Sequence, residues 1–191
     1  MVKLSFVNMD SFLQNNIKLF KYYKSLGEKT INQISKEELF WQYNEESNSI
    51  AIIIKHLSGN MLSRWTDFLT SDGEKEWRKR DGEFEDSIKS KKELEKIWNK
   101  GWDCLFNALG TLSEEDLNKT VYIRNMSQSV SDAINRQLAH YAYHVGQIVF
   151  IGKMMNNKDW KSLSIPKGDS IKYNKEKFNI PKQGKHFTDD E

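Results

Sequence analysis

The sequence predicts an all-α fold, a four-helix bundle followed by an irregular C-terminal tail. Apolar residues recur at helical spacing in four long segments, as they do on the buried faces of helices. The only two prolines are Pro166 and Pro181, so no earlier position lacks the backbone amide that a helix needs. Strict alternation of apolar and polar residues, which indicates strands, is scarce. We therefore expect long helices near residues 10–34, 49–70, 90–110 and 129–155.

The composition is that of an ordinary globular protein. The chain has 191 residues, 38% apolar and 29% charged, enough to bury a single core. A net charge of +2 gives no reason to expect nucleic acid as a partner. The apolar runs are far shorter than the roughly 18 residues of a membrane span, and the N-terminus lacks the pattern of a signal peptide. The single cysteine, Cys104, cannot form an internal disulfide, so we expect a cytoplasmic protein without membrane contact.

Polar residues mark where several helices should begin. Asp10 is a candidate N-cap of the first long helix. Ser35 and Glu38 have the capping-box spacing, a serine followed three residues later by an acid, and should open a short helical turn. Ser90 and Glu93 repeat this spacing at the start of the third long helix. These signals place three helix starts independently of the apolar pattern.

The remaining segments read as loops and a tail. Residues 71–86 contain two Asp-Gly-Glu triplets and dense mixed charge, so we expect a long polar loop. Residues 121–124 form a short extended piece within the next connection. We divide the chain into a bundle, residues 1–159, and a tail, residues 160–191, which has too few apolar residues for its own core and should pack on the bundle. The expected anchors of the tail are Leu163, Ile165, Phe178 and Ile180.

Two histidines stand out in the fourth predicted helix. His140 and His144 lie four residues apart, about one helical turn, so both imidazoles project from the same side. The surrounding sequence is mostly apolar, and a buried imidazole needs a partner for each ring nitrogen. A shared metal ion would satisfy two nitrogens at once, whereas two separately bonded core histidines would need no metal. His56, on the flank of the second predicted helix, adds a third candidate ligand.

This pattern resembles the DinB/YfiT-like superfamily of four-helix bundles. Its hallmark is a histidine on the second helix and an H-x-x-x-H pair on the fourth. The matching residues are His56 in Ile-Lys-His-Leu-Ser-Gly-Asn, and His140 and His144 in His-Tyr-Ala-Tyr-His-Val-Gly-Gln-Ile, and the resemblance covers roughly residues 8–155. The stretches that begin at Arg64 and at Leu163 further resemble a bacterial branch with no settled function. The resemblance implies that the three histidines bind a divalent metal, zinc or nickel, and that the protein could act on a low-molecular-weight thiol of the bacillithiol type.

Three classes of function remain open from the sequence. Three neutral imidazoles leave a metal with open positions, as in catalytic sites, and a structural site would more often be closed by cysteines. The first class, which the resemblance implies, is a metal-dependent transferase that activates a small thiol. The second is a metal-dependent hydrolase. The third is a non-catalytic bundle that binds a metal or a small ligand and works as a homodimer.

Three further residues are candidates for binding a substrate. Asn60 follows His56 by one helical turn, Gln147 follows His144 by three residues, and Arg64 lies two turns after His56. Each could orient a bound molecule, and Arg64 could bind a carboxylate. Polar packing between helices, or bridging of a loop by Arg64, is the alternative for each. The catalytic residues themselves stay unknown at this stage.

Overall fold

The computed structural model describes residues 10–88 and 90–190, and within these ranges the protein is mainly helical. Six α-helices and two short strands occur. The four long helices are α1 (Phe12–Ile31), α3 (Ile50–Trp65), α4 (Lys91–Gly110) and α5 (Val130–Asn156); the short ones are α2 (Lys36–Leu39) and α6 (Ser170–Phe178). The predominantly α-helical fold class is thus confirmed. In the described ranges, none of the helices has the length and apolar character needed to cross a membrane.

Serine side chains cap the N-termini of the long helices. Ser11, rather than the expected Asp10, caps α1: its Oγ accepts a hydrogen bond from the Gln14 amide, and the Gln14 side chain accepts one from the Ser11 amide. Asp10 instead pairs with Lys18 at 2.8 Å. The capping box at Ser35 is present and opens α2, and Ser90 caps α4 by accepting from the Glu93 amide. Each cap satisfies a backbone amide that the first helical turn leaves without a partner.

The helix predicted over residues 49–70 is shorter than expected. α3 ends at Trp65, and the backbone of Asp67 has a φ of 49°, in the left-handed region that a helix cannot contain. The amides of Thr70 and Ser71 both donate to the carbonyl of Asp67, so the apolar spacing continues through turns rather than through helix.

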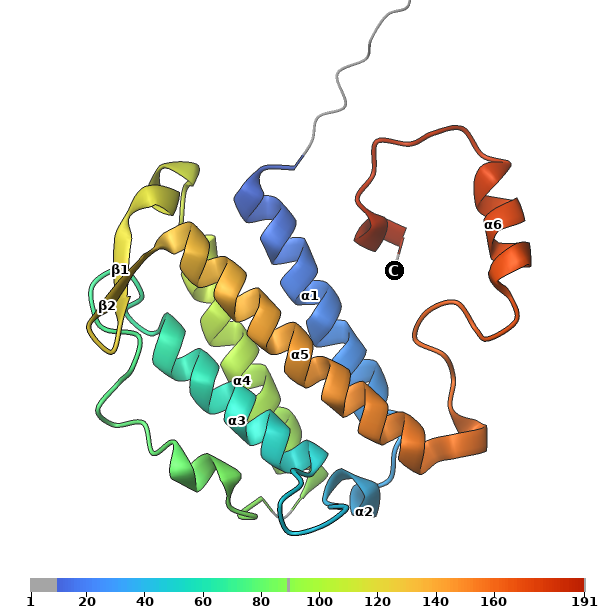
Figure 1. The fold of residues 1–191 in the computed structure, drawn as a ribbon, viewed down its shortest axis with the longest axis horizontal. Helices are drawn as coiled ribbons and strands as arrows, with labels where there is room; N and C mark the ends of the chain where they lie inside the picture. The colour runs from blue at the N-terminus through green and yellow to red at the C-terminus, as the bar shows by residue number, and fades with distance from the viewer. Residues whose placement is uncertain (1–9, 89, 191) are drawn as a thin grey trace, which may run out of the picture.

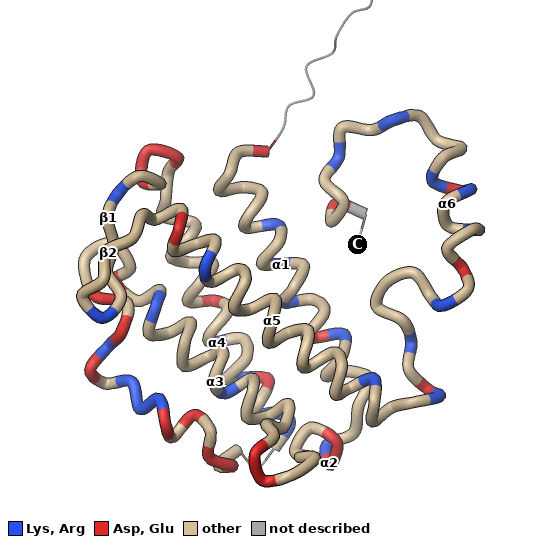
Figure 2. Tube along the Cα trace, viewed as in Figure 1, with Lys and Arg blue, Asp and Glu red and all other residues tan. Residues whose placement is uncertain are grey.

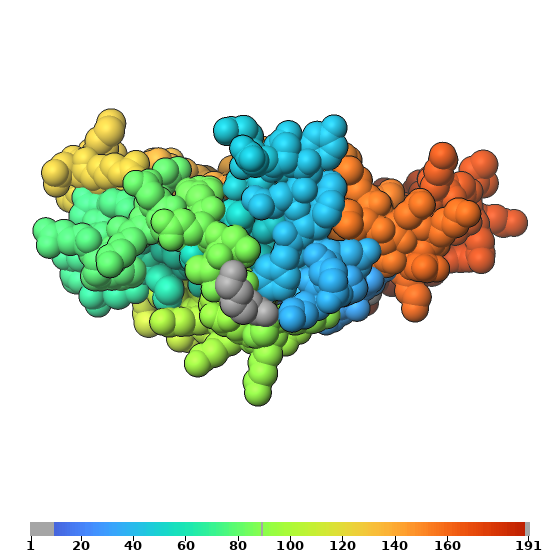
Figure 3. Space-filling view, turned by 90° about the horizontal axis from the view of Figure 1, so that it is seen from below, coloured from blue at the N-terminus to red at the C-terminus, as the bar shows by residue number. Residues whose placement is uncertain are grey.

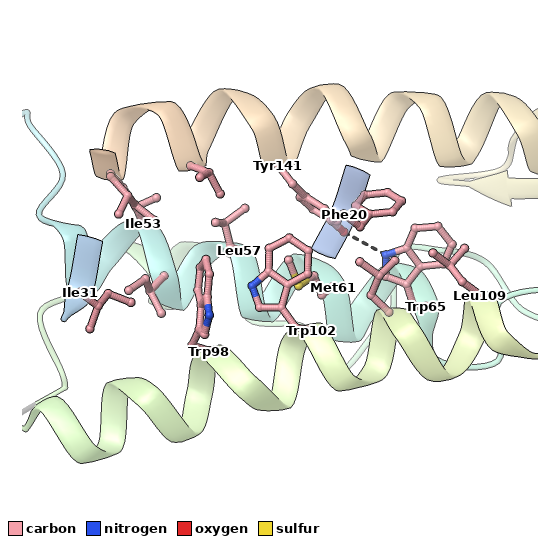
Figure 4. Packing of buried hydrophobic residues seen from close by; sticks show 14 of the residues in the cluster. Phe20, Ile31, Ile53, Leu57, Met61, Trp65, Trp98, Trp102, Leu109 and Tyr141 are labelled. Carbon is pink, nitrogen blue, oxygen red and sulfur yellow. Dashed lines mark hydrogen bonds between the residues drawn. The ribbon is translucent and has the colours of Figure 1, made fainter. Parts of the chain in front are cut away.

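The four long helices lie side by side and share one core (Figure 1). α1 packs mainly against α5, and α3 against α4. Large aromatic side chains from all four helices fill the space between them (Figure 4). Gly101 allows α3 and α4 to approach closely, because a Cβ at this position would lie 2.8 Å from the Ser58 Cα atom.

A β-hairpin precedes α5. β1 (Thr120–Ile123) pairs antiparallel with β2 (Met126–Ser129), with Val121 opposite Gln128. Arg124 and Asn125 form the turn with φ values of 54° and 61°, the twist that suits a two-residue hairpin turn. The sequence predicted only one extended piece here, because the second strand is polar and shows no alternation.

The long polar segment after α3 crosses the outside of that helix. It contains a short 3-10 helix, Asp81–Phe84, that contacts α3 (Figure 1). Lys55 of α3 donates to the Glu85 carbonyl at 3.0 Å and to the Ser87 hydroxyl at 2.6 Å. The segment is therefore tied to the helix that carries His56.

The tail contacts the helical body near its two ends, and its middle stands away from it (Figure 1). The Lys161 amide donates to the Gln33 side chain at 2.7 Å, and Asp189 pairs with Lys18 at 2.9 Å. In the view of Figure 3 the chain after α5 projects from one side of the molecule. The tail was expected to be irregular, but it contains α6, a helix without buried residues. The expected anchors Ile165, Phe178 and Ile180 are exposed, and Leu163 is only half-buried. The division at residue 160 stays a prediction.

Candidate metal centre

Three imidazoles converge between α3 and α5. His140 and His144 project from successive turns of α5 toward His56 on α3, and one nitrogen from each lies within 4.8 Å of the others. Nε2 of His56 and Nε2 of His140 are 3.4 Å apart. His56 is buried, and the other two histidines are half-buried. The helical register of α5 and the pairing of α3 with α5 thus bring together residues 84 positions apart.

The spacing of these nitrogens fits a divalent ion. Two nitrogens bound tetrahedrally at about 2.05 Å would be separated by about 3.3 Å, close to the separation of the His56 and His140 Nε2 atoms. Nδ1 of His56 donates to a carboxylate of Glu83, and Nδ1 of His144 donates to the side-chain oxygen of Gln147 at 2.8 Å. Each of these bonds places the proton on Nδ1 and leaves a lone pair on Nε2 for an ion. The three-histidine cluster could therefore hold a metal ion.

Glu83 is the outer partner of His56. Its Oε2 accepts from His56 Nδ1 at 2.9 Å, and Arg78 donates to both carboxylate oxygens, at 2.8 and 2.9 Å. A Cβ on Gly59 would lie 2.2 Å from Glu83 Oε1, so the carboxylate occupies space that only a glycine leaves free. A carboxylate on the far nitrogen of a metal-binding histidine fixes the ring and increases its basicity.

Burial and neighbouring groups shift the pKa values of residues at the site in directions that favour binding of a cation. Burial lowers the pKa of His140 to about 3, and His144 and His56 add to the shift, so this ring is neutral at neutral pH. Burial likewise lowers the pKa of His144. Burial alone would raise the pKa of Glu83, but the hydrogen bonds from His56 and Arg78 outweigh it and lower that pKa, so the carboxylate is charged. Neutral imidazoles at His140 and His144, together with a charged carboxylate at Glu83, suit the binding of a metal ion.

The three candidate substrate-binding residues differ in their hydrogen-bond partners. Asn60 is buried, and its Oδ1 accepts a hydrogen bond from the Tyr141 hydroxyl at 3.1 Å. The Tyr141 hydroxyl in turn accepts a hydrogen bond from Trp65 Nε1 at 3.0 Å (Figure 4). The side-chain oxygen of Gln147 accepts a hydrogen bond from His144 Nδ1 and holds that ring. Arg64 is buried and pairs with Glu74 of the following loop at 3.0 Å, which is the loop-bridging arrangement given above as its alternative.

A cavity of about 250 Å³ opens beside the histidines. His56, His140, Asn60 and Arg64 all line it. A second cavity, of about 970 Å³, lies between α3 and α4, and no histidine lines it. His186 of the tail is separate from the cluster and bonds to the Thr188 hydroxyl at 2.7 Å.

Glu83 and Arg78 were not among the residues singled out from the sequence. Their signal was present, because the two Asp-Gly-Glu triplets of the long loop supply Glu74 and Glu83, the acids that pair with the arginines. Nothing in the sequence fixes the path of this loop across α3, so the triplets alone could not be assigned to the site.

The fold and the site define a mainly helical protein with a cluster of three histidines that could hold a metal ion. The model of the family described as "Protein of unknown function (DUF1572)" matches residues 8–169, and the chain belongs to this family. The match includes all three histidines and the loop that carries Glu83, and it ends just before α6. No curated protein matches the sequence.

Proposed function

We propose that this protein is a metal-dependent enzyme of the DinB-like four-helix-bundle type, with a divalent ion, zinc or nickel, held by His56, His140 and His144. The observation that carries the proposal is the 3.4 Å separation of the His56 and His140 Nε2 atoms, while Glu83 binds the opposite ring nitrogen of His56. A bound divalent ion would supply Lewis acidity and lower the pKa of a coordinated thiol or water. Three protein ligands leave room for such a molecule.

The residues of the chain have distinct tasks in this proposal. Glu83 and Gln147 hold the Nδ1 protons of His56 and His144 and thereby direct the Nε2 lone pairs inward. Because Tyr141 donates to its Oδ1, Asn60 keeps its amide NH₂ group available on the cavity wall. These groups orient and polarise a bound molecule without themselves forming covalent bonds.

The reaction that we propose is transfer of a low-molecular-weight thiol, supported by the resemblance to thiol transferases of the bundle superfamily. The thiol sulfur forms a bond to an electrophilic carbon, that carbon releases its leaving group, and the thiol proton passes to solvent. Homodimer formation also stays a proposal; Tyr143 and Phe150 on the outer side of α5 are 63% and 66% exposed.

The test combines metal analysis with a thiol assay. Purified protein should contain about one zinc or nickel per chain by elemental analysis, and His140→Ala should lose it. Metal-loaded protein should then consume cysteine or a cysteinyl-sugar thiol in the presence of an alkylating electrophile, faster than the His140→Ala variant. Metal binding without thiol consumption, but with ester or amide hydrolysis, would point to the hydrolase instead. A protein inert in both assays would overturn the enzymatic proposal.

A further inference from the structure

The arginines of this protein are gathered in one place. Lysine and arginine together number 29, but only five are arginine. All five arginines line the cavity of about 250 Å³ beside the histidines, together with His56, Asn60, Gln137 and His140. Basic residues as a whole are spread along the chain (Figure 2), so the convergence belongs to arginine alone. The five are Arg64, Arg78, Arg80, Arg124 and Arg136.

The arginines come from four different parts of the fold. Arg64 lies on α3, Arg78 and Arg80 lie in the loop that follows it, Arg124 is in the hairpin turn, and Arg136 is on α5. The side chains of Arg64 and Arg78 are 8% and 2% exposed, whereas the other three residues are exposed. The buried pair thus forms the inner wall, and the exposed three surround the opening.

Structural ion pairs account for only part of this charge. Glu74 pairs with Arg64, Arg78 and Arg124, and Glu83 with Arg78, so two carboxylates face five guanidinium groups. Within residues 10–88 and 90–190, Arg80 and Arg136 form no ion pair, and no acidic residue lines the cavity. The cavity is therefore strongly positive and lacks an anion of its own.

Two buried polar atoms at the cavity are also without partners. Gln137 is 4% exposed, and its Oε1 has no hydrogen bond. Nε of the buried Arg64 side chain also has no hydrogen bond. A buried polar atom without a partner is costly, and a bound ligand is one way in which such atoms are satisfied.

We propose that this arginine cavity binds the anionic group, a carboxylate or a phosphate, of a small substrate whose reactive end lies at the three histidines. Guanidinium groups bind both anions through paired N–H donors, which the ammonium group of lysine cannot do. His56 and His140 line the same cavity, so one small molecule can contact both the arginines and the histidine cluster. The inference rests on the proposed function for the role of this molecule as substrate.

Calorimetric titration of the metal-free, full-length protein tests the anion site by itself. Inorganic phosphate and malonate are titrated separately at constant ionic strength. We expect saturable binding of one anion per chain, and the tighter of the two identifies the substrate group as phosphate or carboxylate. Because no metal is present, a negative result would leave the metal proposal standing, and failure of the metal assay would leave a positive result standing.

Variants of the exposed arginines decide whether the binding occurs in this cavity. Arg136→Gln and Arg80→Gln should each weaken the anion about tenfold, as expected for loss of a charged hydrogen bond. Lys153→Gln removes an equal charge from an exposed position near the far end of α5 and should leave the affinity unchanged. Absence of saturable binding for both anions would overturn the proposal, as would equal affinities in the arginine variants and Lys153→Gln.

Discussion

Nδ1 of His56 donates a hydrogen bond to the buried carboxylate of Glu83 at 2.9 Å, across 27 residues of sequence. This contact joins helix α3 to the polar loop that crosses it. Arg78 donates to both oxygens of the same carboxylate, so its position is fixed from two sides. The loop therefore supplies part of the candidate metal centre.

Replacing Glu83 by Gln should weaken metal binding about 10- to 100-fold, the usual cost of losing an outer partner of a metal-binding histidine. The uncharged amide of the introduced glutamine cannot balance the charge of Arg78, and it accepts a weaker hydrogen bond from His56 Nδ1 than the carboxylate does. Competition with a chromogenic chelator measures the affinity. Glu85→Gln removes the same charge from an exposed neighbour and is the matched control. Equal affinities in the two variants would contradict an outer role for Glu83.

Gly59→Ala should destabilise the protein and disturb the same contact. The added Cβ would lie 2.2 Å from Glu83 Oε1, so the carboxylate or α3 must move. We expect a loss of about 1–3 kcal/mol in the free energy of unfolding, in the range of overpacked cores. Gly146→Ala on α5 meets nothing within 4 Å and should instead stabilise by up to about 1 kcal/mol. Urea unfolding compares the two variants. An unchanged free energy of unfolding in Gly59→Ala would show that the loop carrying Glu83 can move aside without loss of stability.

Histidine variants should separate the cluster from the rest of the chain. His144→Ala removes one of the three candidate ligands and should abolish most of the metal affinity, whereas His186→Ala should leave it intact, because His186 bonds within the tail. Elemental analysis after dialysis against trace metal gives the stoichiometry of each. Full metal content in His144→Ala would exclude this residue from the site.

Asp72 should stabilise the hairpin turn in a pH-dependent way. Its carboxylate accepts from the amides of Glu74, Arg124 and Asn125 at 2.7–2.8 Å. Burial raises the pKa of Asp72, but these hydrogen bonds outweigh it and lower that pKa below 3.8. Because the pKa is lower in the folded state, the stabilisation is present above pH 3.8 and is lost as the pH falls through the lowered value.

The corresponding variant is Asp72→Asn, which should cost about 1–2 kcal/mol at pH 7. The difference in stability between Asp72→Asn and the unmodified protein should shrink as the pH falls below 4, because Asp72 takes up a proton as the pH passes through its lowered pKa and then carries no more charge than Asn. Chemical unfolding at several pH values measures it, and exposed Asp103 provides an Asp→Asn control. A difference independent of pH would mean that the carboxylate charge contributes nothing.

The sequence by itself determined the helical class and the three candidate ligands. Apolar spacing and serine caps are local signals, and the i, i+4 spacing of His140 and His144 puts both on one side of a helix wherever that helix packs. His56 joins these two histidines once its own helix packs beside theirs.

Only the tertiary structure decided what surrounds these histidines. Glu83, Arg78 and Arg80 come from a loop without periodicity, whose course depends on contacts with α3 such as those of Lys55. Arg124 depends on a hairpin whose second strand is polar, and Arg136 on the register of α5 beside that hairpin. Electrostatic and hydrogen-bonding contacts between distant segments have no repeat in the sequence, so the convergence of the arginines appears only when the chain is folded.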